Sequence, residues 1–279
     1  MKYSNYSIFK TELPEIGLER ALDRTLELGF DSVEHLEATG PREVTSYFIN
    51  SVAEARAFKR ELDARGLTLT CYSYAINFLV ENIELQKERA LRHIEYASIL
   101  GSPFFHHTVA GIYDKTKIIY TLDEMYDRVC DNVEFIGRSV NEYGMTVLYE
   151  PQGLYVNRVE GVGKFLYGMK ARGLNVGVCG DTANSLFADC MPIELYRAFA
   201  PDIKHIHVKD YTYGRPRGER FSVGGKQIDY ERIGSGDCDL EGCFALIPDY
   251  DAAISFETVI SDEEMKYAMT RVKEMVEKR

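Results

Sequence analysis

A helical stretch, a glycine and a short apolar run follow one another repeatedly along this chain, and this repetition restricts the fold more than any other feature. The glycines are Gly29, Gly66, Gly101, Gly144 and Gly173, and successive ones are 29 to 43 residues apart. A glycine just past a helix takes the left-handed conformation that ends the helix. Because one strand-plus-helix unit needs about 30 residues or more, the 279 residues accommodate about eight such units.

Capping-box patterns mark where several helices begin. A Ser or Thr followed three residues later by Glu satisfies backbone N–H groups at a helix N-terminus, and this pattern starts at Ser51, Thr121 and Ser261, each time before an amphipathic stretch. Apolar runs predict strands near residues 3–9, 31–36, 67–74, 102–108, 145–150, 175–180, 203–208 and 252–257. Helices are predicted near residues 15–28, 51–65, 82–100, 121–143, 159–171, 191–199, 241–248 and 261–277.

Eight alternations of strand and helix predict an α/β fold, a (β/α)8 TIM barrel that occupies residues 1–279 as a single domain. The main alternative, a doubly wound open sheet, favours a Gly-rich loop after the first strand, and the sequence has none there. No domain boundary is apparent. The long segment 209–236 is interpreted as a functional loop rather than a linker.

Composition excludes several classes of partner. The formal net charge of −11 disfavours binding to nucleic acids and to anionic membrane surfaces. No apolar run approaches the roughly 20 residues that span a bilayer, and the first ten residues lack the apolar core of a signal peptide. The six cysteines form no CxxC pair, so a cysteine zinc cage is not expected. Free thiols without a secretion signal predict a cytoplasmic protein.

Ionisable residues stand at the ends of four successive predicted strands, and in a barrel this is where active sites lie. The fifth strand ends in Glu150, the sixth in Asp181, the seventh in His207 and the eighth in Glu257. Three carboxylates at one barrel mouth repel one another unless a cation neutralises them. Carboxylates with one imidazole suit Mn²⁺, Co²⁺, Mg²⁺ or Zn²⁺, so the four residues predict a metal site.

Short motifs in this order and spacing resemble the xylose-isomerase-like barrels of the sugar phosphate isomerase/epimerase group. That group includes ketose 3-epimerases, hydroxypyruvate isomerases, inosose dehydratases and 3-dehydroshikimate dehydratases. The matching segments are residues 28–34 (LGFDSVE), 149–151 (YEP), 180–182 (GDT), 205–210 (HIHVKD), 233–239 (IGSGDCD) and 256–257 (FE). The similarity spans nearly the whole chain and is specific for the superfamily rather than for a substrate.

The resemblance implies that Glu150, Asp181, His207 and Glu257 bind one divalent metal, with Mn²⁺ the first expectation. It also implies that Glu150 and Glu257 act as acid and base on opposite faces of a small sugar or polyol-derived substrate. One glutamate removes a proton next to a carbonyl, the metal stabilises the enediolate, and the second glutamate can return the proton. Asn184 departs from the pattern, because the epimerases commonly have a His there, and an amide cannot act as an acid.

Four further residues are candidates for substrate binding. Glu34 ends the second strand and is expected either to contact the substrate or to support a metal ligand. Of two adjacent histidines on the fourth strand, His107 is the one expected to point into the barrel mouth. Lys209 could bind a substrate oxygen or polarise a carbonyl, and Arg217 lies in a locally basic loop that could attract a phosphate or carboxylate. Asn184 joins this set as a donor to a hydroxyl.

The leading functional hypothesis is a metal-dependent sugar isomerase or epimerase that acts through an enediolate. The alternative is a metal-dependent lyase, such as a dehydratase of a cyclic polyol or keto acid or a related C–O or C–C eliminating enzyme. DNA repair is disfavoured, because the apurinic endonucleases that share this barrel need more histidines than the six present. A catalytically inactive binding barrel would lack a metal ligand, and none of the four is missing. The family is also compatible with a homo-oligomer.

Overall fold

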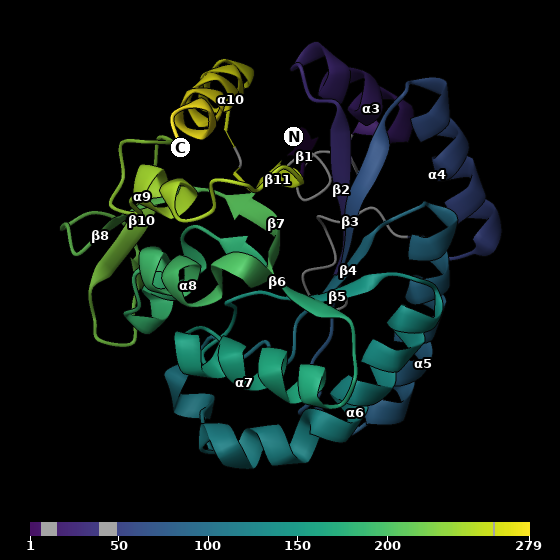
Figure 1. The fold of residues 1–279 in the computed structure, drawn as a ribbon, viewed down its shortest axis with the longest axis vertical. Coiled ribbons are helices and arrows are strands. Elements are labelled where there is room, and N and C mark those ends of the chain that lie inside the picture. Colours follow the sequence, from purple (N-terminus) through teal and green to yellow (C-terminus); the bar gives the residue numbers. More distant parts are fainter. Residues whose placement is uncertain (7–15, 39–48, 259) are drawn as a thin grey trace.

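Eight parallel strands close into a barrel in the computed structural model, which describes residues 1–6, 16–38, 49–258 and 260–279 (Figure 1). Each strand pairs with its neighbours in the order β1-β11-β7-β6-β5-β4-β3-β2, and β1 closes the ring by pairing with both β11 and β2. The barrel strands are β1 (Lys2–Asn5), β2 (Ser32–Ala38), β3 (Thr68–Ala75), β4 (Phe104–His107), β5 (Thr146–Tyr149), β6 (Val176–Asp181), β7 (Ile203–Val208) and β11 (Ala253–Phe256).

Helices follow the strands and form the outer ring (Figure 1). They are α3 (Leu18–Glu27), α4 (Val52–Ala64), α5 (Ile83–Ile99), α6 (Leu122–Glu142), α7 (Val159–Ala171), α8 (Pro192–Phe199), α9 (Leu240–Ala245) and α10 (Asp262–Glu277). Short 3₁₀ turns occur at η1 (Lys115–Lys117), η2 (Asn184–Ala188) and η3 (Ala200–Asp202). The predicted TIM barrel is therefore confirmed. The end of the predicted strand 3–9 and the start of the predicted helix 15–28 lie outside the described residues.

Local signals set the helix boundaries as the sequence predicts. Thr121 accepts a hydrogen bond from the Glu124 backbone, and the Glu124 side chain returns one to the Thr121 backbone, completing a capping box. Ser51 and Ser261 likewise accept from the backbone N–H three residues later. All five of the recurring glycines have φ between 67° and 87°, the left-handed conformation that lets the chain leave the helix.

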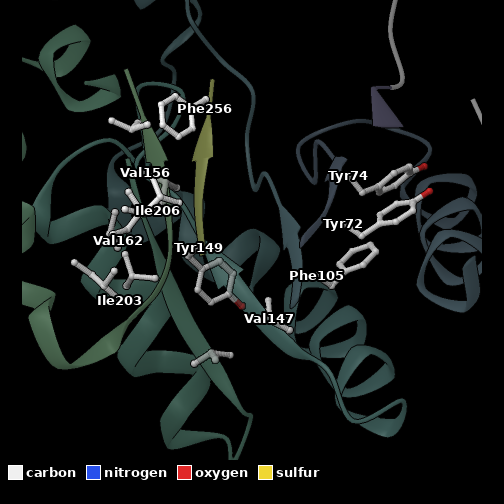
Figure 2. Packing of buried hydrophobic residues seen from close by; sticks show 14 of the residues in the cluster. Tyr72, Tyr74, Phe105, Val147, Tyr149, Val156, Val162, Ile203, Ile206 and Phe256 are labelled. Atoms are coloured by element: carbon white, nitrogen blue, oxygen red, sulfur yellow. The ribbon is translucent and has the colours of Figure 1, made fainter. Parts of the chain in front are cut away.

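The main hydrophobic core lies between the strands and the surrounding helices. Tyr72, Phe105 and Tyr149 point out of the barrel wall and are fully buried under the helices (Figure 2). Inside the barrel, Cys71 and Cys179 form a small separate apolar layer with Leu148. Because side chains alternate along each strand, the outward positions fill the core while the inward positions remain available for a polar site.

The segment 209–236 is not the plain loop that the sequence suggested. It contains a three-stranded antiparallel sheet of β8 (Asp210–Tyr213), β9 (Arg220–Phe221) and β10 (Gln227–Glu231), in the order β8-β10-β9. The Asp210 carboxylate accepts hydrogen bonds from the backbone N–H groups of Gly234 and Gly236, both 2.9 Å long, and ties the sheet to the following turn. A Cβ on Gly236 would lie 2.0 Å from that carboxylate, so this position requires glycine.

Among the described residues, no helix combines the length and the apolar character needed to cross a bilayer.

Candidate active site

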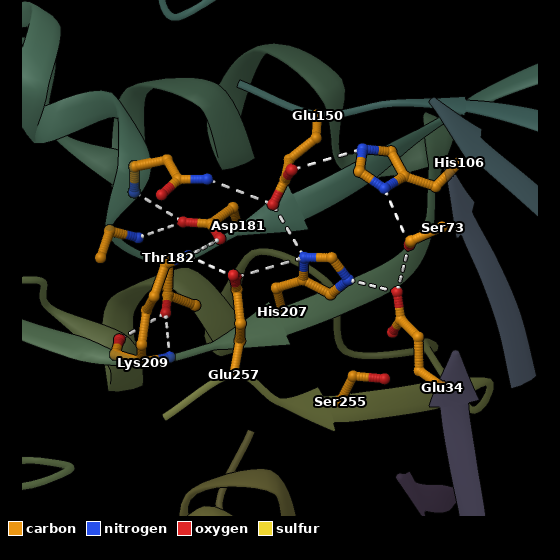
Figure 3. A network of polar contacts seen from close by, with 12 residues as sticks. Glu34, Ser73, His106, Glu150, Asp181, Thr182, His207, Lys209, Ser255 and Glu257 are labelled. Atoms are coloured by element: carbon orange, nitrogen blue, oxygen red, sulfur yellow. Dashed lines mark hydrogen bonds and ion pairs between the residues drawn. The ribbon is translucent and has the colours of Figure 1, made fainter. Parts of the chain in front are cut away.

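Glu150, Asp181, His207 and Glu257 converge at the C-terminal ends of four neighbouring strands (Figure 3). One ligand atom from each of the four side chains lies within 4.8 Å of the others, and all four residues are buried. His207 Nδ1 is 2.7 Å from Glu150 Oε1 and 3.6 Å from Glu257 Oε2. The strand register produces this meeting, since His207 is paired with Asp181 on one side and with Ser255, two residues before Glu257, on the other.

Glu34 lies beneath this cluster and orients His207. The Glu34 carboxylate is fully buried, 2.9 Å from His207 Nε2 and 2.7 Å from His205 Nε2, and it accepts a 2.6 Å hydrogen bond from Ser73. Burial opposes ionisation of Glu34, but the two histidines outweigh it and hold the pKa of Glu34 well below its usual range. With Nε2 of His207 bound to Glu34, Nδ1 is the ring nitrogen that faces Glu150 and Glu257. Tyr6 stacks on the same ring at 5.0 Å.

A lysine lies between two of the carboxylates. Lys209 Nζ is 2.8 Å from Asp181 Oδ2 and also forms a short ion pair with Glu257. Burial lowers the pKa of Lys209, but Asp181 and Glu257 outweigh it and raise that pKa well above its usual value. Burial raises the pKa of Asp181 to about 7, with the neighbouring glutamates adding to the effect and Lys209 opposing it. The ammonium therefore partly compensates a buried excess of negative charge.

Asn184 and His106 flank Glu150. Asn184 Nδ2 donates to Glu150 Oε1 at 3.2 Å, and the backbone N–H of Asn184 donates to Asp181 Oδ1 at 2.6 Å. His106 Nε2 is 3.3 Å from Glu150 Oε2. Burial raises the pKa of Glu150, but His207 and His106 outweigh burial and hold that pKa well below its usual range. Glu150 is thus held as an ionised carboxylate.

The prediction that His107 points into the barrel mouth was wrong, because His106 occupies that side. His107 points outward, edge-on to Tyr149 with ring centroids 5.5 Å apart, and its Nδ1 is 3.0 Å from the Thr108 carbonyl oxygen. Burial lowers the pKa of His107 to about 4, so the ring is neutral. Neighbouring residues of a strand face opposite sides, and the sequence alone did not fix which of the two faces the interior.

Arg217 is placed away from the four-ligand cluster. Its guanidinium is about half exposed and pairs with Glu231 at 3.1 Å and Asp229 at 3.4 Å, both on β10. Its contacts with the described residues are all within the small antiparallel sheet and its loops. In this arrangement Arg217 stabilises the segment between β8 and β10.

Sequence reasoning missed Ser73, His106 and Cys179, which the structure brings to the site. Ser73 links Glu34 to His106, whose Nδ1 lies 2.9 Å from the Ser73 hydroxyl. Cys179 lies beside Glu150 and His207, on the same face of β6 as Asp181. The signal for Ser73 was its position near the end of the third strand, but a serine there carries no charge and is common in such strands.

The donor set fits a divalent cation. Three carboxylates and one imidazole nitrogen are the oxygen and nitrogen ligands that Mn²⁺, Mg²⁺ and Zn²⁺ accept. Asp181 Oδ2 is buried and, apart from its ion pair with Lys209, has no hydrogen-bond partner among the described residues. A ligand histidine commonly donates its second ring N–H to a carboxylate, as His207 can to Glu34. Each of these features is typical of a site built for a metal.

Comparison with known proteins identifies the family. The model of the family described as "Xylose isomerase-like TIM barrel" matches residues 22–275. The chain belongs to this xylose isomerase-like family. Among curated proteins, an inosose dehydratase from Bacillus anthracis is 23% identical over 213 residues, which cover 71% of this chain and 66% of that enzyme. An inosose dehydratase from Bacillus velezensis is 22% identical over 262 residues, covering 86% of this chain and 81% of the relative.

Several solved structures share the fold at low sequence identity. The probable 3-DHS dehydratase of petrobactin synthesis from Bacillus anthracis superposes with a TM-score of 0.73 at 14% identity, over 98% of this chain and 99% of that one. An L-ribulose 3-epimerase gives 0.74 at 15%, over 99% and 95%. The IolI protein with a bound zinc atom gives 0.73 at 16%, over 100% and 99%. Both an epimerase and a dehydratase thus share this fold, and the fold alone does not choose between the two activities.

Proposed function

We propose that this protein is a metal-dependent lyase that removes a proton next to the carbonyl of a small polyol-derived ketone and then eliminates water. The observation that carries the proposal is the buried ammonium of Lys209, held against Asp181 and Glu257 beside the ionised Glu150. A base and a cationic proton donor in one pocket are what an elimination needs. The inosose dehydratases among the relatives, and Asn184 at a position where epimerases carry histidine, agree with this reading.

The four side chains that would hold a divalent cation are Glu150, Asp181, His207 and Glu257. When bound, such a cation would supply positive charge that stabilises an enediolate. Glu34, through its bond to His207 Nε2, would keep Nδ1 free of its proton and directed at the site.

Proton transfers in the proposed reaction belong to the chain's own residues. Glu150 accepts the proton from the carbon next to the carbonyl, and the electron pair of the broken C–H bond is delocalised onto the carbonyl oxygen. In a second step this electron pair forms the new C=C bond as the C–O bond of the next carbon breaks. Lys209 donates a proton to the departing hydroxyl, so water leaves. The proton on Glu150 returns to Lys209 through solvent. Asn184 and His106, both beside Glu150, are placed to orient substrate hydroxyls.

Isomerisation or epimerisation is the second candidate, and Glu257 is the observation that favours it. Glu257 is a second carboxylate beside His207 Nδ1. In this reaction Glu150 would accept the proton from the substrate, and Glu257 would donate a proton back to the substrate without loss of water. The two reactions share the first step and differ in whether a C–O bond breaks.

Nuclear magnetic resonance in D₂O separates the two reactions. The metal-loaded protein would be incubated with an inosose, with 3-dehydroshikimate and with the free ketose L-ribulose. Elimination is expected to give a new vinylic or aromatic signal with loss of one water. Solvent deuterium incorporated at the carbon next to the carbonyl, with no water lost from any of the substrates, would contradict the lyase proposal and favour the isomerase.

Bound metal is a separate prediction. Protein purified without chelator or affinity tag is expected to carry about one divalent ion per chain by elemental mass spectrometry, because three buried carboxylates need the charge. Chelator should remove the activity, and Mn²⁺ at 100 times its Kd should raise the free energy of unfolding by about 2.7 kcal/mol. The surface variant Glu142→Gln is the control and should keep its metal. No binding at millimolar Mn²⁺, Co²⁺, Mg²⁺ or Zn²⁺ would contradict the metal site.

A further inference from the structure

A cavity lies outside the barrel wall, between β2, β3 and α5. Its volume is about 290 Å³, near the lower end for small-molecule sites. Side chains that line it include Glu37 on β2, Tyr74 on β3, and Arg89, Arg92, His93 and Tyr96 on α5. Tyr72 and Tyr74 point to the same side of β3, with their hydroxyls directed alike (Figure 2), whereas Ser73 between them faces the barrel interior. The cavity is therefore separate from the candidate active site.

The inner wall of this cavity offers hydrogen-bonding groups that the protein leaves unused. The Tyr74 hydroxyl is buried, on a side chain that is 1% exposed, and it has no hydrogen-bond partner among the described residues. A buried polar group without a partner is costly, so its presence calls for a ligand or an ordered water. Nδ1 of His93 is hydrogen-bonded to the Tyr72 hydroxyl at 2.8 Å, so Nε2 can bond to another partner.

Positive charge lies at the same cavity. No ion pair or hydrogen bond joins Arg89 to any described residue, although Arg89 is only partly exposed. Arg92 pairs with Glu88 on the exposed side of α5 at 2.6 Å. The one carboxylate in the lining, Glu37, is already held by His35 Nε2 at 2.9 Å and by the Ile49 backbone N–H at 3.3 Å. A guanidinium that makes no ion pair with a described residue, on a protein of net charge −11, is suited to bind an anion.

The side chains of His93 and Tyr74 in the lining are uncharged and can form hydrogen bonds with the hydroxyl groups of a ligand. Burial lowers the pKa of His93 to about 3, with His35 and Arg92 contributing, so the ring is neutral at physiological pH. Burial raises the pKa of Tyr74 to about 12, with Glu37 adding to the effect, so its hydroxyl stays a donor. Strand β3 thus offers a phenol, and helix α5 offers an imidazole and guanidinium groups.

We infer that this cavity is a second ligand site, which binds a small polyhydroxylated anion. Arg89, with Arg92 beside it, binds the phosphate or carboxylate group, and Tyr74 and His93 bind hydroxyl groups of the same molecule. Nothing in this site depends on the metal or on the proposed lyase reaction.

Isothermal titration calorimetry with glucose 6-phosphate and D-gluconate tests this site, and glucose is the uncharged control. At least one of the two anions is expected to bind with a Kd of about 1 mM or below, while glucose binds at least about tenfold more weakly. Binding of glucose 6-phosphate alone identifies a phosphate site, and binding of gluconate alone identifies a carboxylate site. Inorganic phosphate should bind more weakly than glucose 6-phosphate, because it lacks the hydroxyls that Tyr74 and His93 bind.

Variants separate this cavity from the rest of the protein. Arg89→Gln should weaken binding of the anion at least about tenfold, and Tyr74→Phe about threefold or more, since each removes one hydrogen-bonding group. Arg60→Gln, an exposed arginine on α4, is the matched control and should bind like the unmodified chain. The double variant Glu150→Gln/Glu257→Gln should also retain binding. The inference is overturned if neither anion binds below about 10 mM, or if Arg89→Gln binds the anion as tightly as the unmodified chain. Loss of binding in the double variant would then place the anion at the candidate active site.

Discussion

Replacing Glu150 by glutamine is expected to lower kcat about 10³-fold, because a positioned general base contributes roughly 10² to 10⁴. The Glu150 carboxylate is buried, accepts from Asn184 at 3.2 Å and lies 2.7 Å from His207 Nδ1. Glutamine has nearly the same shape, so it fills the same space, but its amide cannot accept the substrate proton. The measurement is kcat and KM on whichever ketone is turned over in D₂O, together with the metal content of the variant.

Metal content decides how a loss of activity in Glu150→Gln is read. A variant that keeps about one ion per chain while kcat falls has lost the base, and one that also loses the ion has lost a ligand as well. Glu142→Gln, an exposed glutamate at the end of α6, controls for the substitution itself and should match the unmodified chain. If Glu150→Gln keeps kcat within about tenfold while the metal is bound, Glu150 is not the base and the proposed mechanism fails.

The barrel could be predicted from the sequence because its signals are local. Glycines that end helices, such as Gly66 and Gly144, and the cap at Thr121 each depend on a few neighbouring residues, and the structure confirms all of them. The meeting of the four strand-end residues followed from the barrel itself, since the carboxyl ends of parallel strands gather at one rim. Once eight units were counted, the place of the candidate site needed no further information.

Features that depend on pairing or depth could not be predicted in the same way. Choosing His106 over His107 needed the phase of β4, which is only four residues long and apolar or aromatic on both faces. The small antiparallel sheet depends on β8 pairing with β10, although β9 lies between them along the chain, and its short strands look like a loop in the sequence. The position of Glu34 beneath His207 rather than at the rim depends on the stagger of β2 against β3, where a register irregularity occurs between Val33 and Glu34.

The cavity beside Tyr74 is the clearest case of information that the sequence does not carry. Only the packing of α5 against β3 stacks the His93 ring on Tyr74 and brings Arg89 into the lining of the same cavity. A cavity of this kind depends on how many side chains pack together, and the sequence pattern alone does not show that packing.

Replacing Lys209 by methionine is expected to abolish elimination while sparing the first proton transfer. The rate of water loss should fall about 10²- to 10⁴-fold, because methionine cannot protonate the departing hydroxyl. Glu150 makes no ion pair with Lys209, so exchange of the substrate proton with solvent deuterium should continue. Nuclear magnetic resonance in D₂O reports both processes in one sample, deuterium at the carbon next to the carbonyl and the signal of the eliminated product.

Stability of the Lys209→Met variant gives an independent readout of the same lysine. Removing one partner of a buried ion pair typically costs about 3 to 5 kcal/mol, so the metal-free variant should unfold at lower urea concentration than the unmodified chain. Added Mn²⁺ should recover more stability in the variant than in the unmodified chain, because the carboxylates of Asp181 and Glu257 then have no ammonium to share. Lys170→Met, which breaks a surface pair with Asp202, should cost less than about 1 kcal/mol.

If deuterium exchange and elimination fall together in a folded, metal-loaded Lys209→Met protein, Lys209 acts before the C–O bond breaks, and its assignment as the donor to the leaving hydroxyl is wrong.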